Sequence, residues 1–416
     1  MKILIVSIGT RGDMEPFLAV GQLLRKRGHQ VIAVFPAQFE DLVKAAGLEF
    51  RSLGSEFLDM LETDAGKRAL GTGGPFWKKI PAFIHLAFKY GGINKQLIIR
   101  QAEIVKKEQP DRIIRHAKAV YPVLWSLDNH GKVILLSPIP YIVHLVKDRA
   151  HIAFAGNYGL TINRITYWIA MGGLTQTIKK SAAWLNKKCS TREIRKAVLG
   201  AKTIYTISPQ IFERPDYWPE NVKVLGYQER KSSSSWEIDT QLDSFIEKHE
   251  KVLFVTFGSM VNPSPKEKTR VLIEVIHKLK IPTVINIAAG GLIIPELYDR
   301  DLVYFVNDVP YDWILPRMYA MVHHGGSGTT HLSLKHGCAS MIIPHIIDQY
   351  MWNGVLSDLG VGPKGMDIGD FKLKQLEIKL NDLWGNPSYK KRAKEISIKM
   401  AMEDFDEEII QTIVDD

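Results

Sequence analysis

Cysteine is scarce in this chain: only Cys189 and Cys338 occur in 416 residues. Two cysteines cannot build the disulfide framework of a small secreted domain, and they suit a reducing compartment. A secretory leader is not expected, because the first apolar run is short and polar residues 10–13 follow it with no small-residue cleavage site. We therefore expect a cytoplasmic protein and leave open a peripheral position at a membrane surface.

Long apolar runs and metal-ligand clusters are also missing from the sequence. No stretch is long enough to span a bilayer, and no His, Cys, Asp and Glu residues recur at metal-ligand spacing, so no metal is expected. The net charge of +9 comes with no recognised nucleic-acid-binding motif, so no nucleic-acid partner is expected. A hydrophobic content of 45% is typical of a globular protein, and 416 residues are natural for two domains.

Charge is divided unevenly along the chain. Residues 1–226 contain 33 Lys and Arg against 18 Asp and Glu, whereas residues 227–416 contain 21 against 27. A basic first half fits an anionic partner such as acidic lipid headgroups, and it equally fits a solvated basic surface.

Short apolar runs alternate with stretches of helical periodicity through both halves. The first run ends at Gly9, a helix is expected over 16–27, and the next run covers 31–35. This alternation predicts an α/β protein with parallel sheets. A polar, Ser-rich stretch at 228–235 interrupts the pattern and predicts a linker between two domains.

A glycine-rich turn at 322–330 lies between a predicted strand and a predicted helix. Glycines let backbone N–H groups approach an anion, and a helix start adds partial positive charge, so the turn predicts a phosphate site. The turn has neither the spacing of a Walker A loop nor that of a G-x-G-x-x-G fingerprint, and an ordinary strand–helix turn is the alternative. The candidate phosphate ligands are His323, Gly325, Gly326, Ser327, Gly328 and Thr329.

Asp348 and Gln349 follow the next apolar run, at 341–344. Ligands of open α/β sheets bind beyond the carboxyl ends of the strands, so these side chains are expected beside the phosphate turn. A carboxylate next to an amide suits the paired hydroxyls of a sugar. Asp348 is equally suited to be a helix N-cap.

These motifs, from Asp312-Trp313 through the glycine-rich turn to Leu359-Gly-Val-Gly-Pro363, resemble the donor half of family-1 glycosyltransferases. The likeness is greatest to the sterol and antibiotic glucosyltransferase branch. It is specific over 303–363 and at the N-terminus, and weak over 54–202. It implies the GT-B fold, in which two Rossmann-like domains face each other across a cleft and the last helix crosses back.

The resemblance implies a division of the chain into four parts. Residues 1–227 are the expected acceptor-binding domain, 228–240 the linker and 241–395 the nucleotide-sugar domain, and 396–416 the helix that packs back on the first domain. The implied activity is transfer of a hexose, with inversion, from a UDP-sugar to a hydrophobic alcohol, phenol or lipid. Glucose is the expected hexose. The UDP-sugar is a co-substrate, and no cofactor is expected.

The same resemblance assigns further donor contacts. Ser259 is expected near the phosphates, and Val309 is expected to touch the nucleobase through its backbone. Arg11 and Gly12 are candidates for the pyrophosphate, with a solvated loop charge as the alternative for Arg11.

Asp13 is the candidate catalytic base, because it stands where many relatives carry a histidine and a base is needed near the acceptor hydroxyl. An ordinary carboxylate pKa is low for this task, so burial and apolar neighbours are expected to raise it. The alternative is a helix N-cap, since Pro16 suits a first helical turn. His116 is expected either to orient Asp13 or to touch the acceptor, and a solvated loop histidine is the alternative.

Aromatic residues in two regions where the family resemblance is weak are candidates for the acceptor pocket. Phe76, Trp77 and Phe83 belong to an apolar and basic stretch at 75–90, which also fits a membrane-surface contact. Tyr141 opens a second aromatic region. Helix core is an equally good account of both. Two other functions remain open: a UDP-sugar epimerase on the same fold, and a non-catalytic nucleotide-sugar-binding protein.

Overall fold

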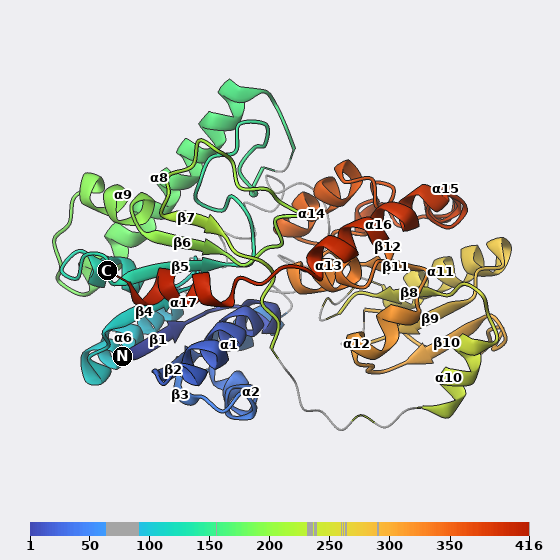
Figure 1. Ribbon diagram of the computed structural model, residues 1–416, viewed down its shortest axis with the longest axis horizontal. Helices are drawn as coiled ribbons and strands as arrows, with labels where there is room; N and C mark the ends of the chain where they lie inside the picture. The colour runs from blue at the N-terminus through green and yellow to red at the C-terminus, as the bar shows by residue number, and fades with distance from the viewer. Residues whose placement is uncertain are drawn as a thin grey trace. The chain divides into compact units, whose positions relative to one another are not determined.

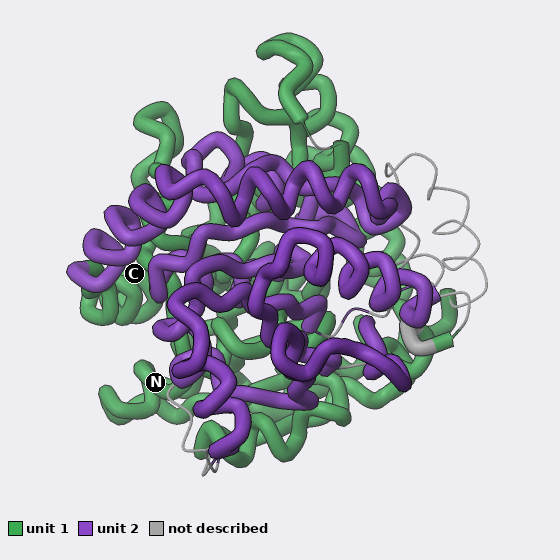
Figure 2. Tube along the Cα trace, turned by 90° about the vertical axis from the view of Figure 1, so that its right-hand side faces the viewer, with its two compact units in different colours: residues 1–66, 81–232, 403–416 green, residues 67–80, 233–402 purple. Residues whose placement is uncertain are grey.

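The computed structural model describes residues 1–63, 91–154, 156–230, 236, 239–258, 260, 262, 264–288 and 291–415. These residues form two compact units, which Figure 2 shows in different colours. The first unit takes the described residues of the ranges 1–66, 81–232 and 403–416, and the second takes those of 233–402. Each unit has one parallel sheet with helices on both faces (Figure 1).

The sheet of the first unit has seven parallel strands in the order β3-β2-β1-β4-β5-β6-β7. Successive side chains of β1 point to opposite faces, with Ile3 and Ile5 in one apolar cluster and Leu4 and Val6 in another. The sheet is therefore buried on both sides. Its strands are β1 (Lys2–Val6), β2 (Gln30–Phe35), β3 (Glu49–Ser52), β4 (Arg112–Arg115), β5 (Val133–Ser137), β6 (Lys202–Tyr205) and β7 (Val222–Val224).

Helices cover both faces of this sheet. Three helices contribute to the first cluster: α1 (Arg11–Lys26), α2 (Glu40–Ala45) and α17 (Asp406–Val414). The other face is covered by α6 (Gly91–Glu108), α7 (Tyr121–Ser126), α8 (Leu160–Trp184) and α9 (Thr191–Leu199). The short elements η1 (Ala37–Phe39) and α3 (Glu56–Glu62) complete the unit.

The sheet of the second unit has five parallel strands in the order β10-β9-β8-β11-β12. These are β8 (Leu253–Thr256), β9 (Thr283–Asn286), β10 (Val303–Val306), β11 (Ala320–His323) and β12 (Ala339–Ile342). Its helices are α10 (Thr240–Glu247), α11 (Pro265–Leu279), α12 (Tyr311–Ile314), η2 (Leu315–Arg317), α13 (Ser327–Lys335), α14 (Ile347–Asp358), η3 (Ile368–Asp370), α15 (Leu373–Gly385) and α16 (Pro387–Met400).

The predicted fold class is confirmed, including the return of the last helix to the first unit. The helix α17 packs against β4 and α1, and Ile409, Ile410 and Ile413 are buried in the core there. One strand went unpredicted: β3 pairs with β2 at the end of the sheet and reads Glu-Phe-Arg-Ser. It has no apolar run because its side chains are at most half-buried.

The helix α1 begins at Arg11, five residues before the expected start at residue 16, so that predicted boundary is wrong. A capping box between Thr10 and Asp13 starts the helix early, because each residue satisfies a backbone N–H at the helix start. Pro16 is accommodated inside the helix.

Four predicted site residues, Phe76, Trp77, Phe83 and Ser259, lie outside the described residues. The four-part division of the chain stays a prediction.

Each sheet has a topological switch point, a pair of neighbouring strands from which the chain connections run outward in opposite directions. Ligands of open α/β sheets bind beyond the carboxyl ends of the strands at this point. In the first unit this point lies between β1 and β4, and in the second between β8 and β11.

Candidate active site

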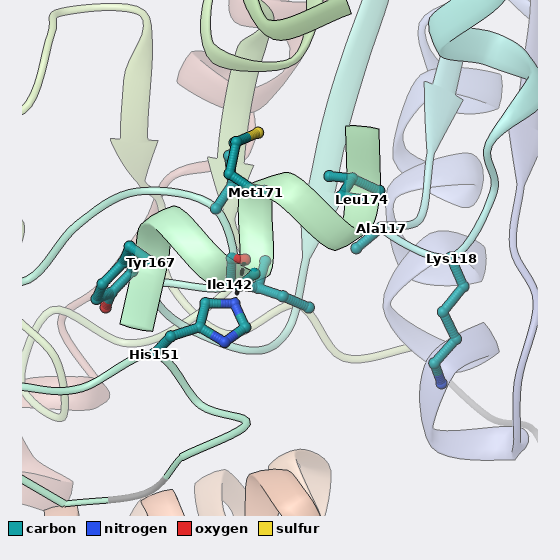
Figure 3. A pocket seen from close by; sticks show the side chains of 9 residues that line it. Ala117, Lys118, Ile142, His151, Tyr167, Met171 and Leu174 are labelled. Carbon is teal, nitrogen blue, oxygen red and sulfur yellow. Dashed lines mark hydrogen bonds between the residues drawn. The ribbon is translucent and has the colours of Figure 1, made fainter. Parts of the chain in front are cut away.

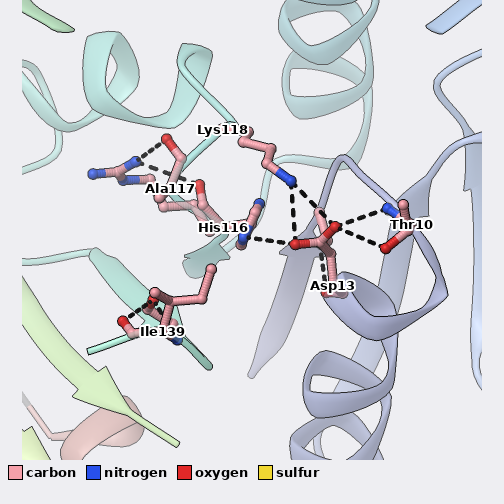
Figure 4. Close-up of polar contacts among 9 residues, drawn as sticks. Thr10, Asp13, His116, Ala117, Lys118 and Ile139 are labelled. Atoms are coloured by element: carbon pink, nitrogen blue, oxygen red, sulfur yellow. Dashed lines mark hydrogen bonds and ion pairs between the residues drawn. The ribbon is translucent and has the colours of Figure 1, made fainter. Parts of the chain in front are cut away.

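The switch point of the first unit brings together the residues that follow β1 and β4. Asp13 stands in the first turn of α1, directly after β1, and His116 and Lys118 follow the end of β4. Figure 4 shows the imidazole of His116, the ammonium of Lys118 and Thr10 gathered around the Asp13 carboxylate. Segments about a hundred residues apart in the sequence thus meet in this site because β1 and β4 are neighbouring strands.

Asp13 is held by local structure and is 8% exposed. It occupies the third helical position and not the N-cap, which is Thr10, so the N-cap alternative is wrong. Its Oδ2 accepts the Thr10 N–H at 2.8 Å. Gly9 has φ of +146°, and a Cβ there would lie 2.0 Å from Asp13 Oδ2, so only glycine leaves room for the carboxylate.

Lys118 is the strongest charged neighbour of Asp13, with its Nζ 3.2 Å from both carboxylate oxygens. Burial acts to raise the pKa of Asp13, but the Lys118 ammonium, His116 in its protonated form and the Thr10 N–H together outweigh burial and lower the pKa from its ordinary value. The expectation of a raised pKa is therefore wrong. Asp13 is ionised at neutral pH.

His116 is fully buried, so the alternative of a solvated loop histidine is wrong. Its Nε2 lies 3.4 Å from Asp13 Oδ1, and its ring stands edge-on to Phe17 with centroids 6.0 Å apart. Burial lowers the pKa of His116 to about 4, so the ring is neutral at pH 7. A neutral ring packed in this way fixes where the carboxylate sits without adding charge.

A cavity of about 210 Å³ lies beside this cluster (Figure 3). Lys118, whose ammonium contacts Asp13, is one of the residues of its wall. Two other polar wall residues are already bonded, His151 to the Ile142 carbonyl at 3.1 Å and the Tyr167 hydroxyl to the Val146 N–H at 3.3 Å. The rest of the wall is apolar: Ala117, Ile142, Val143, Ala170, Met171 and Leu174. An apolar molecule with one hydroxyl fits this chemistry, with the hydroxyl toward Lys118 and Asp13.

Two predicted contacts of the first unit lie elsewhere. Tyr141 is buried, with its ring centroid 5.6 Å from that of Phe212. The next two residues, Ile142 and Val143, line the cavity instead of Tyr141. Arg11 is exposed and bonds to Glu15 one turn along α1, at 3.0 Å. This pair matches the alternative of a solvated charge for Arg11, while Gly12 lies beside it in the same first turn.

The switch point of the second unit carries the glycine-rich turn. His323 ends β11, Gly326 is the N-cap residue of α13, and Ser327, Gly328 and Thr329 form the first turn of that helix. The helix start presents backbone N–H groups, and Gly326 has no side chain to bond them. The predicted strand–turn–helix arrangement around the turn is therefore present.

His324 fills the space between two glycines. A Cβ on Gly326 would lie 2.6 Å from its Nε2, and a Cβ on Gly258, which follows β8, would lie 2.9 Å from its Cε1. Within the described parts of the chain, its buried Nδ1 has no hydrogen-bond partner. The ring is thus wedged at the helix start with one polar atom unsatisfied.

His323 is also buried and neutral, because burial lowers its pKa to about 3. Its Nδ1 accepts the Gly325 N–H at 3.2 Å, which leaves the proton on Nε2. That Nε2 is buried with no hydrogen-bond partner among the described residues. Unsatisfied buried nitrogens are rare in proteins, and two beside a helix N-terminus are what an anion site requires before its ligand arrives.

Asp348 and Gln349 lie in the first turn of α14. The N-cap of this helix is Ile346, so the N-cap alternative for Asp348 is wrong. Gln349 is 2% exposed, and its Oε1 accepts the N–H groups of His345 at 2.7 Å and Ile346 at 3.2 Å. The Gln349 oxygen therefore caps the helix, and its role toward a sugar stays a prediction. Val309 is buried in the core, and its backbone role also stays a prediction.

Two residues of these sites were not predicted. Lys118 was not singled out, because its pairing with Asp13 spans 105 positions and no local pattern marks it. His324 was left out of the predicted donor set in favour of His323. Two glycines directly follow the His-His pair, but Gly258 on the other flank of the ring lies far upstream, so no local pattern marked His324.

Comparisons with known proteins agree with this arrangement. A model of the glycosyltransferase family 28 N-terminal domain matches residues 3–115, and one of the erythromycin biosynthesis protein CIII-like C-terminal domain matches residues 296–415. The sterol 3-beta-glucosyltransferase UGT80A2 of Arabidopsis thaliana is 27% identical over 408 residues, which cover 92% of this chain and 60% of that protein. The sterol 3-beta-glucosyltransferase of Pichia angusta is 26% identical over 431 residues, covering 99% of this chain and 33% of that protein.

Solved structures share the fold over nearly the whole chain. CalG4, the calicheamicin glycosyltransferase, superposes with a TM-score of 0.68 at 17% identity, covering 99% of this chain and 97% of its own. The glycosyltransferase VinC, solved in complex with DTDP, superposes with a TM-score of 0.66 at 15% identity and covers 99% of each chain.

The two sheets and the structural comparisons show the GT-B fold. In sequence the chain is similar to sterol 3-beta-glucosyltransferases, and its two ends match a glycosyltransferase family 28 N-terminal domain and an erythromycin biosynthesis protein CIII-like C-terminal domain. It spans 60% of the length of the Arabidopsis relative and 33% of the Pichia one. Among the helices that the structure describes, none is both long enough and apolar enough to cross a membrane.

Proposed function

We propose that this chain transfers a hexose from a UDP-sugar to the hydroxyl of a hydrophobic small molecule or lipid, with inversion at the anomeric carbon. Glucose is the proposed hexose. The observation that carries the proposal is the buried carboxylate of Asp13, which bonds to Lys118, a residue that lines an apolar cavity. The names of the relatives support a sterol or a similarly rigid apolar alcohol as the acceptor.

The proposed reaction is a single displacement. The acceptor oxygen attacks the anomeric carbon from the face opposite the nucleotide and forms the new C–O bond. The bond from that carbon to the β-phosphate oxygen breaks, and UDP leaves with the electron pair. Asp13 takes the proton of the acceptor hydroxyl.

The low pKa of Asp13 decides when the proton moves. A carboxylate whose pKa is lowered from its ordinary value is a weak base toward a neutral alcohol, so the proposal places proton removal after attack begins. The hydroxyl becomes acidic only as its oxygen bonds to carbon. Transfer to Asp13 therefore comes late, and the carboxylate acts mainly by stabilising the positive charge that develops on the acceptor oxygen.

The leaving UDP needs stabilisation of its growing negative charge. Burial keeps His323 neutral and lowers the pKa of His324 well below its ordinary value, so neither ring offers a full positive charge at pH 7. The proposed stabilisation therefore comes from neutral N–H donors and the start of α13. Such donors are already in place before the reaction and need no proton transfer.

A UDP-release assay tests this function. The chain is incubated with UDP-glucose, with TDP-glucose and with each sugar nucleotide plus a panel of sterols, phenols and other hydrophobic alcohols. We expect UDP release that depends on an acceptor, together with a glucoside whose anomeric configuration, read by NMR, is opposite to that of the donor.

Other outcomes of the assay point to other functions. Conversion of the UDP-sugar to its epimer without any alcohol would replace the proposal with an epimerase. Binding of UDP without turnover of any donor would favour a nucleotide-sugar-binding protein. Retention of the donor configuration would contradict the single displacement.

Replacing Lys118 tests the electrostatic part of the site. In Lys118→Met the ammonium that lowers the pKa of Asp13 is gone, so that pKa rises. Activity requires ionised Asp13 and falls as the pH drops through its pKa. We therefore expect the acidic limb of the kcat/KM profile to move to higher pH in the variant.

Lys132→Met is the matched control, because Lys132 is an exposed lysine of the same unit. Its profile is expected to coincide with that of the unchanged protein. A Lys118→Met profile that does not move, or moves to lower pH, would show that Asp13 is not the group that titrates.

A further inference from the structure

The first half of α8 presents an apolar face to solvent. Ile162, Ile165, Trp168 and Ile169 are 52%, 49%, 67% and 48% exposed. Their spacing of three and four residues places them on one side of the helix. A helix that only covered the sheet would bury its large apolar side chains against the sheet. These four side chains are instead exposed among the residues that the structure describes.

The other side of the same helix forms part of the pocket. Tyr167, Ala170, Met171 and Leu174 line the cavity, and Figure 3 shows Tyr167, Met171 and Leu174 along one stretch of helix. A single helix therefore separates the cavity from a bare apolar surface.

Charge around this helix has one sign. Residues 149–192 contain no Asp or Glu. The same stretch has seven basic residues: Arg149, Arg164, Lys179, Lys180, Lys187, Lys188 and Arg192. Arg164 is exposed within the apolar face itself, and Lys179 and Lys180 are exposed farther along the helix. Asp148 and Glu193 flank this stretch, but every charged residue of α8 itself is basic. An apolar face on a helix that carries only positive charges is complementary to a surface that is apolar inside and anionic outside.

We propose that this face of α8 docks on an anionic lipid membrane and that a lipid acceptor enters the cavity from there. The docking itself stands on the exposed side chains and their charge, and the route of the acceptor rests on the proposed function. Large apolar side chains with Trp on one side and basic residues nearby are the features of helices that lie in a membrane interface. A second copy of this chain is a poor partner, because it would bring two uniformly basic surfaces together.

Vesicle flotation with the full chain tests the docking. The vesicles are phosphatidylcholine alone, or phosphatidylcholine with phosphatidylglycerol as the anionic lipid. We expect binding to the anionic vesicles that weakens as salt is added and is much weaker on phosphatidylcholine alone. Arg164→Glu is expected to reduce binding by about fivefold or more, since each basic residue near an anionic surface contributes about that factor. Trp168→Ser is expected to reduce it at least as much.

Two variants in the second unit are matched controls. Leu297→Ser removes an apolar side chain that is 91% exposed, and Lys374→Glu reverses an exposed lysine. Both are expected to bind vesicles like the unchanged protein. Thermal melting of all four variants checks that they fold, because each change is at an exposed position.

The results separate docking from the proposed function. Failure of the chain to bind anionic vesicles, or equal binding by Trp168→Ser and Arg164→Glu, would overturn the docking whatever the enzyme assay shows. A concentration-dependent dimer that Trp168→Ser abolishes would assign the face to a second copy instead. Glucosylation of a sterol in detergent is expected to survive Trp168→Ser, whereas glucosylation of the same sterol in anionic vesicles is expected to fall with binding.

Discussion

Asp13→Asn should lower acceptor-dependent UDP release by roughly 10²–10⁴-fold, the usual contribution of a positioned general base. The amide cannot take the proton of the acceptor hydroxyl or offset the charge that develops on its oxygen. Asparagine keeps the size of the side chain and an oxygen that can accept the Thr10 N–H, which is now bonded at 2.8 Å. The start of α1 is therefore expected to stay intact, and the loss of rate reports the chemistry.

Glu15→Gln is the control for this experiment. Glu15 lies in the same helix, and among the contacts described its carboxylate bonds to the exposed Arg11 and to Arg230, whose side chain is 8% exposed. The variant is expected to keep the rate within a few-fold. Affinity for UDP, measured by calorimetry, should be the same in both variants. Asp13→Asn with an unchanged rate would remove Asp13 from the mechanism and leave acceptor positioning as its only role.

Gly326→Ala should weaken UDP binding by about tenfold or more, a loss of about 1.4 kcal/mol. The backbone of Gly326 has φ of −62°, which alanine adopts freely, so strain is not the reason. The reason is the ring of His324, whose Nε2 would lie 2.6 Å from the new Cβ. Retreat of the ring is limited because Gly258 lies close on its other flank. The ring or the helix start has to move, and both belong to the proposed phosphate site.

A double-mutant cycle makes this prediction specific. His324→Ala removes the ring, so adding Gly326→Ala to that variant should cost little more. Gly385→Ala, at the end of α15, is the control, because nothing lies within 4 Å of the Cβ that it adds. Additive effects of the two changes would mean that Gly326 matters for a reason other than His324. Equal UDP affinity in Gly326→Ala and the unchanged protein would refute a phosphate site at this helix start.

The glycine-rich turn could be predicted because its information is local. Strand, turn and helix start follow one another within about a dozen residues, and the structure has them in that order. The surroundings of Asp13 are not local. Lys118 and His116 reach it only because β1 and β4 are neighbours in the sheet, and strand order is not written in any one stretch of sequence.

The pKa of Asp13 was predicted in the wrong direction because its partner Lys118 was not identified from the sequence. Burial of a carboxylate alone predicts a raised pKa, and burial does act in that direction here. The Lys118 ammonium at 3.2 Å, together with His116 and the Thr10 N–H, reverses the direction of the shift. The strand β3 was missed for a different reason: its half-buried side chains lack the apolar pattern by which strands are found in a sequence.

The position of α17 has a consequence for how the chain is made. Residues 406–414 complete the core of the first unit, yet they leave the ribosome after every residue of the second. Domains usually fold in the order of synthesis. The first sheet therefore keeps the apolar surface that Ile409, Ile410 and Ile413 later cover exposed until the whole second unit and α17 have been synthesised. Synthesis of α17, and not synthesis of the linker, is the event that allows the core of the first unit to be completed.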